Sequence, residues 1–356
     1  MVVLHYASVS RNNASGVSVI VPQIMNSQTA FAQVGFYNYG KESFDTIQDV
    51  TRISDFHSKD DYRTFPAPFN CPDIVVFHSP FAIPRIVALA KILRKAGIPF
   101  IIVPHGCFSS FAMKKKWLKK RIARLVYMDR VVKASAGIQY LSEGEKNVSV
   151  YDKQSFIVPN GIFVPEYVEK DRKEILEISF IGRKDLYHKG LDYLIEACGI
   201  AKDQLRDKVR INIYGPASDQ QAAMICQLVT THDVQDFVFD LPPVFGGEKT
   251  KVYMDTDVFV LTSRFEGQPV AILEAWSNGV PTLVTPGTNV AEECSKNGCG
   301  WSVAPNAQAI AEKLIYLTNN REKIAQSAKN AYCYVNKKYS WENIAKIYCA
   351  EYQDIK

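Results

Sequence analysis

Short apolar runs of strand length alternate with segments of helical spacing along most of the 356-residue chain. In the first half these runs fall at residues 2–6, 74–77, 99–103 and 137–141. In the second half they fall at 178–181, 210–214, 237–239, 258–261 and 282–284. Buried strands that alternate with helices form parallel sheets with helices on both faces. Two successive sets therefore predict an α/β protein with two doubly wound, Rossmann-like domains.

A turn-forming cluster separates the two sets of strands. Residues 158–162 read Val-Pro-Asn-Gly-Ile, and Pro165 and a charged run follow them. We place the boundary there, which gives a first domain of residues 1–163 and a second domain of residues 164–339. The last segment, about 340–356, has apolar residues at helical spacing. We expect it to form a helix that packs back on the first domain.

Charged residues follow two strands of the second set, at the edge where open parallel sheets bind ligands. The run 258–261 leads through a Gly/Pro loop into a helix, and Glu266 and Glu274 lie eight positions apart in it. The amides that open this helix suit hydroxyl or phosphate oxygens, and a carboxylate beside them can accept hydrogen bonds from a sugar or a ribose. The alternative interpretation makes Glu266 a solvated loop residue and Glu274 an ordinary helical one.

Two cations and a histidine stand at comparable places. Arg183 and Lys189 lie between the strand 178–181 and the helix after it, where a diphosphate could rest at the positive end of the helix; they could equally be solvated. In the first half, Gly16 forms a single-glycine turn after the first strand, and His105 follows the strand 99–103. A lone histidine is more often structural, but this one stands at a ligand-binding edge.

These elements, in this order, resemble the family 4 glycosyltransferases, which are retaining enzymes of the GT-B architecture. The resemblance spans nearly the whole chain. It is carried by the Glu-x7-Glu element at 266–274 with Gly279-Val280-Pro281 after it, the Gly-Arg…Lys-Gly element at 182–190, the Pro-Asn-Gly linker at 159–161, the Pro-His-Gly turn at 104–106 and the aromatic C-terminal helix. It implies a GT-B fold in which an acceptor-side domain and a donor-binding domain face a central cleft.

The resemblance also implies a role for each candidate residue. Glu274 would hold the ribose hydroxyls, and Glu266 and His105 would contact the transferred sugar as the catalytic pair. The donor diphosphate would be bound by Arg183, Lys189 and the loop around Gly16. Backbone groups of Gln268, Pro269 and Val270 would line the sugar and phosphate pocket, although Gln268-Pro269 stands where the family commonly has Phe-Gly.

The implied reaction moves a hexose or N-acetylhexosamine from a nucleotide diphosphate sugar, with UDP favoured over GDP, to a hydroxyl group. The acceptor would be a glycan or a polyprenyl-diphosphate-linked glycan of surface polysaccharide biosynthesis. Such enzymes need no metal or other cofactor, because two cations and a helix terminus take the place of the metal, and the sugar is substituted on its front face. A sugar epimerase of the same fold and a non-catalytic membrane-docking scaffold are the alternatives.

The net charge of +5 hides an uneven distribution, because residues 74–128 contain eleven Lys and Arg but no Asp or Glu. The densest part, 113–126, places apolar residues on one face of a helix and cations on the others. The expected patch is Lys114, Lys115, Lys116, Trp117, Lys119, Lys120, Arg121 and Arg124. A basic amphipathic helix with a tryptophan suits an anionic membrane surface. A solvated helix is an alternative, and nucleic acid is not an expected partner because aromatic residues are not interleaved for base stacking.

The sequence shows none of the patterns that direct a protein into or across a membrane. No apolar run approaches the roughly 18 residues of a membrane-spanning helix, and the N-terminus lacks the pattern of a signal peptide. Eight cysteines are scattered without a C-x-x-C pair, which is typical of reduced thiols in a cytosolic protein. We therefore expect a cytoplasmic protein, peripheral on the inner face of the cell membrane.

Overall fold

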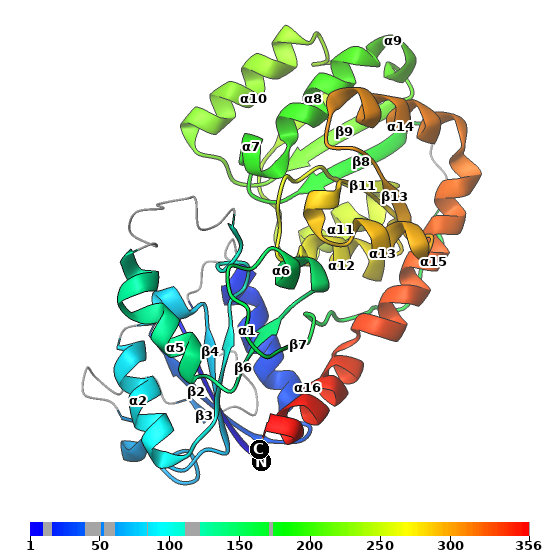
Figure 1. Ribbon diagram of the computed structural model, residues 1–356. Coiled ribbons are helices and arrows are strands. Elements are labelled where there is room, and N and C mark those ends of the chain that lie inside the picture. Colours follow the sequence, from blue (N-terminus) through cyan, green and yellow to red (C-terminus); the bar gives the residue numbers. More distant parts are fainter. Residues whose placement is uncertain are drawn as a thin grey trace. The chain divides into compact units, whose positions relative to one another are not determined.

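The computed structural model describes residues 1–9, 16–39, 51–52, 61–83, 85–110, 122–170 and 174–355. The chain divides into two compact units, which Figure 1 shows with their elements labelled. Unit 1 comprises Met1–Gly161 and Trp341–Lys356, and unit 2 comprises Ile162–Ser340. The boundaries that we placed after 163 and after 339 lie within two residues of these divisions.

The sheet of unit 1 has its strands in the order β3-β2-β1-β4-β5-β6-β7, and every neighbouring pair is parallel. The strands are β1 (Val2–Ala7), β2 (Gln33–Asn38), β3 (Thr51–Arg52), β4 (Ile74–His78), β5 (Phe100–Val103), β6 (Gly137–Tyr140) and β7 (Ser155–Ile157). The chain adds β2 and β3 on one side of β1 and then continues with β4 on the other side. The strand order therefore reverses between β1 and β4, the position at which open α/β sheets bind ligands.

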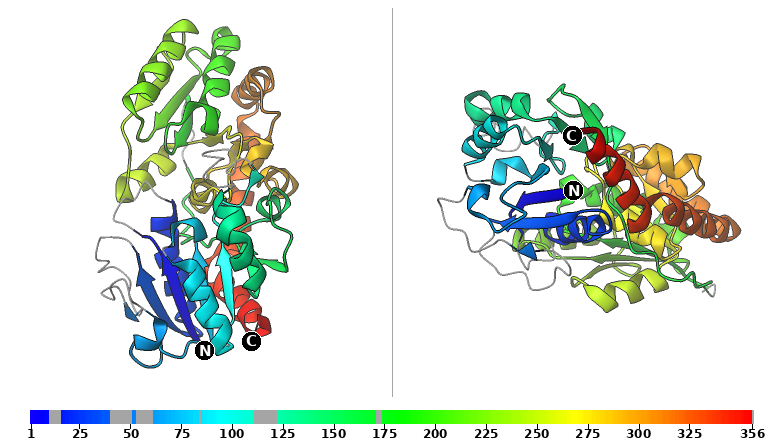
Figure 2. Two further views of the ribbon diagram at one scale, coloured as in Figure 1. Left: turned by 60° about the vertical axis from the view of Figure 1, so that its left-hand side comes forward. Right: turned by 90° about the horizontal axis from the view of Figure 1, so that it is seen from below.

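Helices cover both faces of this sheet (Figure 2). α2 (Ile86–Ala96) packs against α5 (Asp129–Ala134), and α1 (Gly16–Gln28) packs against α16 (Trp341–Ile355). The short helices are η1 (Tyr62–Thr64), η2 (Pro80–Ala82), the π-helix η3 (Arg124–Met128) and α6 (Glu143–Asn147). Both termini of the chain lie in this unit, near one another (Figure 2).

The C-terminal helix packs on unit 1 through the apolar positions that its sequence spacing predicts. Its buried side chains are Trp341, Ile344, Ala345, Tyr348 and Tyr352. Gly161 allows the first of these to approach, because a Cβ atom on Gly161 would lie 2.4 Å from the indole ring. The last segment of the chain is thus part of the core of the unit in which the chain begins.

Unit 2 contains a six-stranded sheet in the order β10-β9-β8-β11-β12-β13, again entirely parallel. Its strands are β8 (Leu176–Ile181), β9 (Val209–Tyr214), β10 (Val238–Leu241), β11 (Val258–Leu261), β12 (Thr282–Val284) and β13 (Gly300–Ser302). Its helices are α7 (Leu186–Lys189), α8 (Leu191–Ile200), α9 (Lys202–Leu205), α10 (Asp219–Thr231), α11 (Gly246–Asp255), α12 (Val270–Ser277), η4 (Pro286–Thr288), α13 (Ala291–Lys296), α14 (Ala307–Asn319) and α15 (Arg321–Tyr339). The strand order reverses between β8 and β11, so unit 2 repeats the doubly wound plan.

The α/β class with two doubly wound sheets is confirmed. All nine strands expected from apolar runs are present, and the described residues add β2, β3, β7 and β13. Of the expected basic helix, residues 114–121 lie outside the described residues. The part that is described continues as the π-helix η3 into α5.

Candidate functional site

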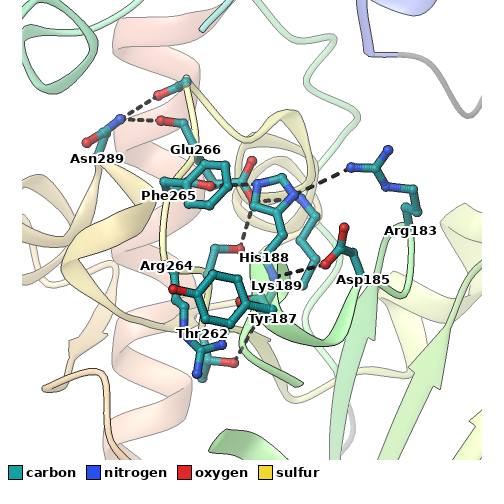
Figure 3. A network of polar contacts seen from close by, with 12 residues as sticks. Arg183, Asp185, Tyr187, His188, Lys189, Thr262, Arg264, Phe265, Glu266 and Asn289 are labelled. Carbon is teal, nitrogen blue, oxygen red and sulfur yellow. Dashed lines mark hydrogen bonds and ion pairs between the residues drawn. The ribbon is translucent and has the colours of Figure 1, made fainter. Parts of the chain in front are cut away.

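Three loops converge at the carboxyl edge of the sheet in unit 2 (Figure 3). They follow β8, β11 and β12, which are neighbouring strands, and the first two flank the reversal of strand order. This is the position at which doubly wound sheets bind ligands. The side chains expected to bind a diphosphate and a sugar lie on the loops after β8 and β11.

The loop after β8 carries Arg183 and Lys189. Asp185 caps the short helix α7 by accepting a hydrogen bond from the His188 amide at 3.0 Å, and Lys189 is the last residue of that helix. Gly190 follows with a φ of 63°, and a Cβ atom there would lie only 2.0 Å from the Thr262 carbonyl oxygen. A glycine is required at this position because the loop passes directly over the end of β11.

Glu266 of the second loop lies against Lys189. The Lys189 Nζ is 2.6 Å from Glu266 Oε1, and the Ser263 hydroxyl donates to the same oxygen at 2.7 Å. The Glu266 side chain is only 11% exposed, so it is not the solvated loop residue of the alternative interpretation. Its side-chain contacts to described residues at hydrogen-bond distance all involve Oε1, which leaves Oε2 available to accept a further hydrogen bond.

His188 joins the two loops and orients Arg183. Its Nε2 donates to the Phe265 carbonyl at 2.8 Å, and its ring stacks on the Phe265 ring at 4.2 Å. Its Nδ1 then accepts from the Arg183 guanidinium at 3.5 Å, as Figure 3 shows. Burial lowers the pKa of His188, which favours the neutral ring that this pattern of donor and acceptor requires.

The loop that carries Glu266 is held from two further sides. Arg264 makes a bidentate pair with Asp192 of α8, at 2.8 and 2.7 Å, and its guanidinium lies over the Tyr193 ring at 3.8 Å. Asn289, after β12, donates to the backbone carbonyls of Glu266 and Gly267 (Figure 3). A loop fixed in this way holds its carboxylate in place before any ligand arrives.

The three residues expected to contribute backbone groups lie where α12 begins. Gln268 is buried, Pro269 caps the helix, and Val270 is its first residue. Pro269 has no amide hydrogen, and its carbonyl accepts from the Ile272 amide at 3.0 Å, so its contribution is to fix the turn. The free N–H groups of the first turn give this end of the helix a partial positive charge.

Glu274 lies one turn farther along α12 and faces α11. The Lys249 Nζ is 2.7 Å from its Oε1, and the Tyr253 hydroxyl donates to its Oε2 at 3.1 Å. Burial raises the pKa of Tyr253 well above its usual value, and the nearby Glu274 carboxylate raises it further. Glu274 is therefore a hydrogen-bonded acceptor with a side chain that is 22% exposed, and not a free surface side chain.

Two candidates belong to unit 1 and are described with it. Gly16 is the first residue of α1. His105 follows β5 with a φ of 49°, and its Nε2 lies 2.9 Å from the Nδ1 of His78. The site residues of unit 2 thus form one group, whereas Gly16 and His105 belong to another part of the chain.

The described end of the basic segment shows two kinds of side chain. Arg124 lies 3.2 Å from Asp129, and its guanidinium lies 5.1 Å from the centre of the Tyr151 ring. Three apolar side chains beside it are exposed: Ile122 at 54%, Leu125 at 66% and Val126 at 58%. The other cations and the tryptophan of the expected patch lie outside the described residues.

Sequence reasoning missed several residues that the structure adds. His188 could have been noticed from its place beside Lys189 between a strand and a helix. Lys249 and Tyr253 carry no local signal, because they reach Glu274 from a helix that is distant in sequence. His5 and His78 lie in or at the end of predicted strands of the first domain, and only strand order brings them to His105.

Two general findings concern metals and membranes. Within the described ranges, no group of three or more His, Cys, Asp and Glu is placed to hold a metal ion. Asp257, part of an Asp-x-Asp pattern, accepts a hydrogen bond from the Glu177 amide at 2.9 Å and lies 3.8 Å from Arg321, a structural arrangement. No helix in the described part of the chain has the length and apolar character needed to cross a bilayer.

The two doubly wound sheets form the fold of the GT-B glycosyltransferases. Residues 167–333, which lie within unit 2 and make up just under half of the chain, match the family described as glycosyl transferases group 1. A solved structure titled Anabaena Alr3699/HepE in complex with UDP and glucose superposes with a TM-score of 0.75, covering 99% of this chain and 100% of that one at 15% identity.

Relatives in three organisms agree with this assignment. The chain is 32% identical to an uncharacterized glycosyltransferase of Methanocaldococcus jannaschii over 50% of its own length and 44% of the relative's. It is 25% identical to a putative teichuronic acid biosynthesis glycosyltransferase of Bacillus subtilis, over 80% of this chain and 71% of that one. It is also 25% identical, over 48% and 45% of the two chains, to a Campylobacter jejuni N-acetylgalactosaminyltransferase named for a diphospho-undecaprenol acceptor.

Proposed function

We propose that this protein transfers a hexose or N-acetylhexosamine, with retention, from a UDP-sugar to a hydroxyl of a glycan or polyprenyl-diphosphate-linked glycan in surface polysaccharide biosynthesis. The observation that carries the proposal is the convergence of Arg183, Lys189 and Glu266 at the reversal of strand order in unit 2, with Glu274 one turn into the following helix. Cations for a diphosphate and carboxylates for hydroxyls thus lie on two adjacent loops and on the helix that follows the second loop.

In the proposed binding mode, the side chains that contact the donor are already held in place by hydrogen bonds within unit 2. The donor diphosphate binds to Arg183 and Lys189, and the ribose hydroxyls donate to the Glu274 carboxylate. A sugar hydroxyl donates to the remaining oxygen of Glu266, which Lys189 and Ser263 hold in place. His105 and the backbone at Gly16 contribute further contacts to sugar and phosphate.

In the proposed reaction, the bond between the anomeric carbon and the diphosphate oxygen breaks, and the acceptor oxygen bonds to the same face of the sugar. The acceptor proton passes to the departing phosphate. The negative charge that develops on the diphosphate is stabilised by Arg183, Lys189 and the N-terminus of α12, which is the largest kind of contribution in such reactions. These groups serve where other transferases use a metal, so we expect full activity in excess EDTA.

We favour UDP as the nucleotide of the donor. The support from the HepE complex with UDP is limited to the fold that the two proteins share. The lipid-linked acceptor is supported by the relative named for diphospho-undecaprenol and by the basic segment. Exposed Ile122, Leu125 and Val126 adjoin that segment in sequence, so cations and uncovered apolar side chains occur together, as at an interfacial helix. The proposal places the protein in the cytoplasm, peripheral on the cell membrane.

The test of the activity is a transfer assay with a panel of UDP- and GDP-sugars and polyprenyl-diphosphate-linked acceptors, analysed by NMR of the product's anomeric centre. We expect one UDP-sugar to give a product of unchanged anomeric configuration. An inverted product would contradict retention, and free epimerised sugar nucleotide in place of a glycoside would indicate an epimerase. Lys189→Ala should abolish transfer, whereas Lys296→Ala, an exposed lysine of α13, should not.

The membrane component is tested separately by co-sedimentation with vesicles. We expect binding to vesicles with anionic lipid and not to neutral ones, and loss of binding when Lys114, Lys115 and Lys116 are changed to glutamine. The matched control changes Lys91, Arg94 and Lys95, three exposed cations of α2 in the same acid-free stretch, to glutamine. Equal loss in both variants would mean that charge alone, and not this segment, attracts the protein to lipid.

A further inference from the structure

Three histidines of unit 1 form a continuous hydrogen-bonded row. His5 Nδ1 lies 2.9 Å from His78 Nε2, and His78 Nδ1 lies 2.9 Å from His105 Nε2. The ring centroids are 5.2 Å apart in each pair. Strand register produces the row, because His5 pairs with Val76 and His78 with Val103. Each histidine therefore lies two residues closer to the carboxyl edge than the one before, on the same face of the sheet.

The inner end of the row continues through an amide and a hydroxyl. His5 Nε2 lies 2.8 Å from Gln28 Oε1, and Gln28 Nε2 donates to the Tyr352 hydroxyl at 3.4 Å. That hydroxyl donates to Gln139 Oε1 at 3.5 Å, and Gln139 Nε2 donates to the Val158 carbonyl at 3.4 Å. A carbonyl oxygen can only accept, so it orients the Gln139 amide and, through it, each following group.

This orientation determines where every proton of the row lies. Because Gln28 Oε1 must accept, His5 carries its proton on Nε2 and can only accept at Nδ1. The same logic places the proton of His78 on its Nε2, and then that of His105 on its own Nε2. Burial lowers the pKa of His5 and of His105 to about 4, and it lowers the pKa of His78 as well, so all three rings are neutral at neutral pH.

The backbone of His105 is held as firmly as its ring. Glu145 of α6 is buried and accepts hydrogen bonds from the amides of Gly106, at 2.5 Å, and Leu141, at 2.8 Å. This carboxylate ties the loop after β5 to the end of β6. His105 keeps its positive φ in that loop, and among the described residues its ring has a hydrogen-bond contact at Nε2 and none at Nδ1.

We propose that His5, His78 and Gln28 are positioning residues that fix His105 as an Nε2-protonated imidazole whose Nδ1 accepts a hydrogen bond from a hydroxyl of the substrate. The identity of the hydroxyl-bearing partner rests on the proposed function, whereas the direction of the protons does not. The direction makes His105 an acceptor and excludes it as a donor. The site then selects a substrate with a hydroxyl group at the contacted position.

The first test is NMR of the full chain with ¹⁵N-labelled histidine near pH 7.5, in which imidazole nitrogen shifts report the tautomer. We expect His5, His78 and His105 each to carry the proton on Nε2. A proton on Nδ1 of His105, or on both of its nitrogens, would overturn the proposal. This measurement needs no substrate.

The second test uses Gln28→Met, which keeps the side-chain shape but removes the amide. We expect mixed tautomers at His105 and about a tenfold lower kcat/KM for the donor. Gln23→Met, on the same helix, should leave the His105 spectrum unchanged. Tyr352→Phe removes only the hydroxyl that orients Gln28, and it should also mix the tautomers if Gln28→Met fails to fold.

The two proposals fail in different ways. If the tautomers are as expected but no nucleotide sugar is bound or used, the proposed function is wrong and the row of histidines stands. If transfer is observed and Gln28→Met mixes the tautomers without lowering kcat/KM, the positioning role is wrong and the proposed function stands.

Discussion

At the scale of single residues, Glu266 shows how its surroundings determine the role of a side chain. Sequence spacing alone left it open whether this carboxylate binds a ligand or is solvated. The structure places it at 11% exposure with Lys189 and Ser263 on one of its two oxygens. Such a carboxylate is fixed in place and can still accept a hydrogen bond at its other oxygen.

Replacing Glu266 should remove catalysis and leave the fold intact. We expect Glu266→Gln to lower kcat about 100-fold or more, because the neutral amide no longer supports the charge of the reacting sugar. Transfer kinetics and circular dichroism measure the two effects, with Glu292→Gln, an exposed residue of α13, as the control. Activity near wild type in Glu266→Gln would show that the site is wrongly assigned.

The buried histidines should make stability depend on pH. In the unfolded chain a histidine binds a proton below a pKa of 6.5, whereas native His5 stays neutral down to about 4. The unfolded state therefore binds more protons between these values, and the free energy of unfolding falls as pH is lowered through this window. Glu145, whose pKa burial raises, has the opposite effect in wild type and variant alike.

Urea unfolding of wild type and His5→Gln at several pH values isolates this effect. We expect the wild-type slope to be steeper by up to about 1.4 kcal/mol per pH unit, the value for one proton. Equal slopes for the two proteins would mean that His5 is protonated in the native state.

At the scale of elements, the site depends on how closely one loop crosses another. Gly190 closes α7 directly over the end of β11, and Thr262 Oγ1 donates to its carbonyl at 2.8 Å. This contact holds Lys189, the residue before Gly190, beside Glu266, so the glycine positions the site without a side chain of its own.

Gly190→Ala should therefore lower both stability and activity. The added methyl group meets the Thr262 carbonyl at 2.0 Å and the φ of 63° disfavours any side chain, so we expect a cost of about 1–3 kcal/mol. Thermal unfolding and donor KM measure the change. Gly247→Ala, where an added Cβ meets nothing within 4 Å, is the control, and equal effects of the two changes would contradict the account.

The strands that sequence predicts are those with continuous apolar runs, such as β4 and β11. Of the four missed strands, β3, β7 and β13 have only two or three residues, and pairing with a neighbour defines them rather than their own sequence. The fourth, β2, has six residues but no continuous apolar run. The residues of the site can likewise be divided into those that the sequence predicts and those that it does not. Residues at strand ends, such as Arg183 and Glu266, could be predicted, whereas Lys249 could not because it meets Glu274 only through tertiary packing.

At the scale of the whole molecule, the chain begins and ends in the same unit. The Tyr348 and Tyr352 hydroxyls of α16 bond to Gln139 and Gln28, so the last helix completes both the core of unit 1 and the row of histidines. Apolar spacing predicted this helix, but nothing in the sequence indicated the hydrogen bonds.

Trp341→Ala should destabilise unit 1 by about 3–5 kcal/mol, because it leaves a cavity against Gly161 at the start of α16. Denaturant unfolding measures this loss, and Lys346→Ala, an exposed residue of the same helix, is the control. A loss below about 1 kcal/mol, the usual range for surface changes, would mean that α16 is not part of the core.

The central claim is that unit 2 binds a nucleoside diphosphate sugar through Arg183, Lys189, Glu266 and Glu274, and the most direct test of it is calorimetric titration of the full chain with UDP. This measurement needs neither the acceptor nor the sugar to be known. We expect one saturable site, with affinity lost at least tenfold in Arg183→Ala and in Glu274→Ala and retained in Glu292→Gln. Absence of binding by both UDP and GDP, or equal affinity in all the variants, would contradict the account.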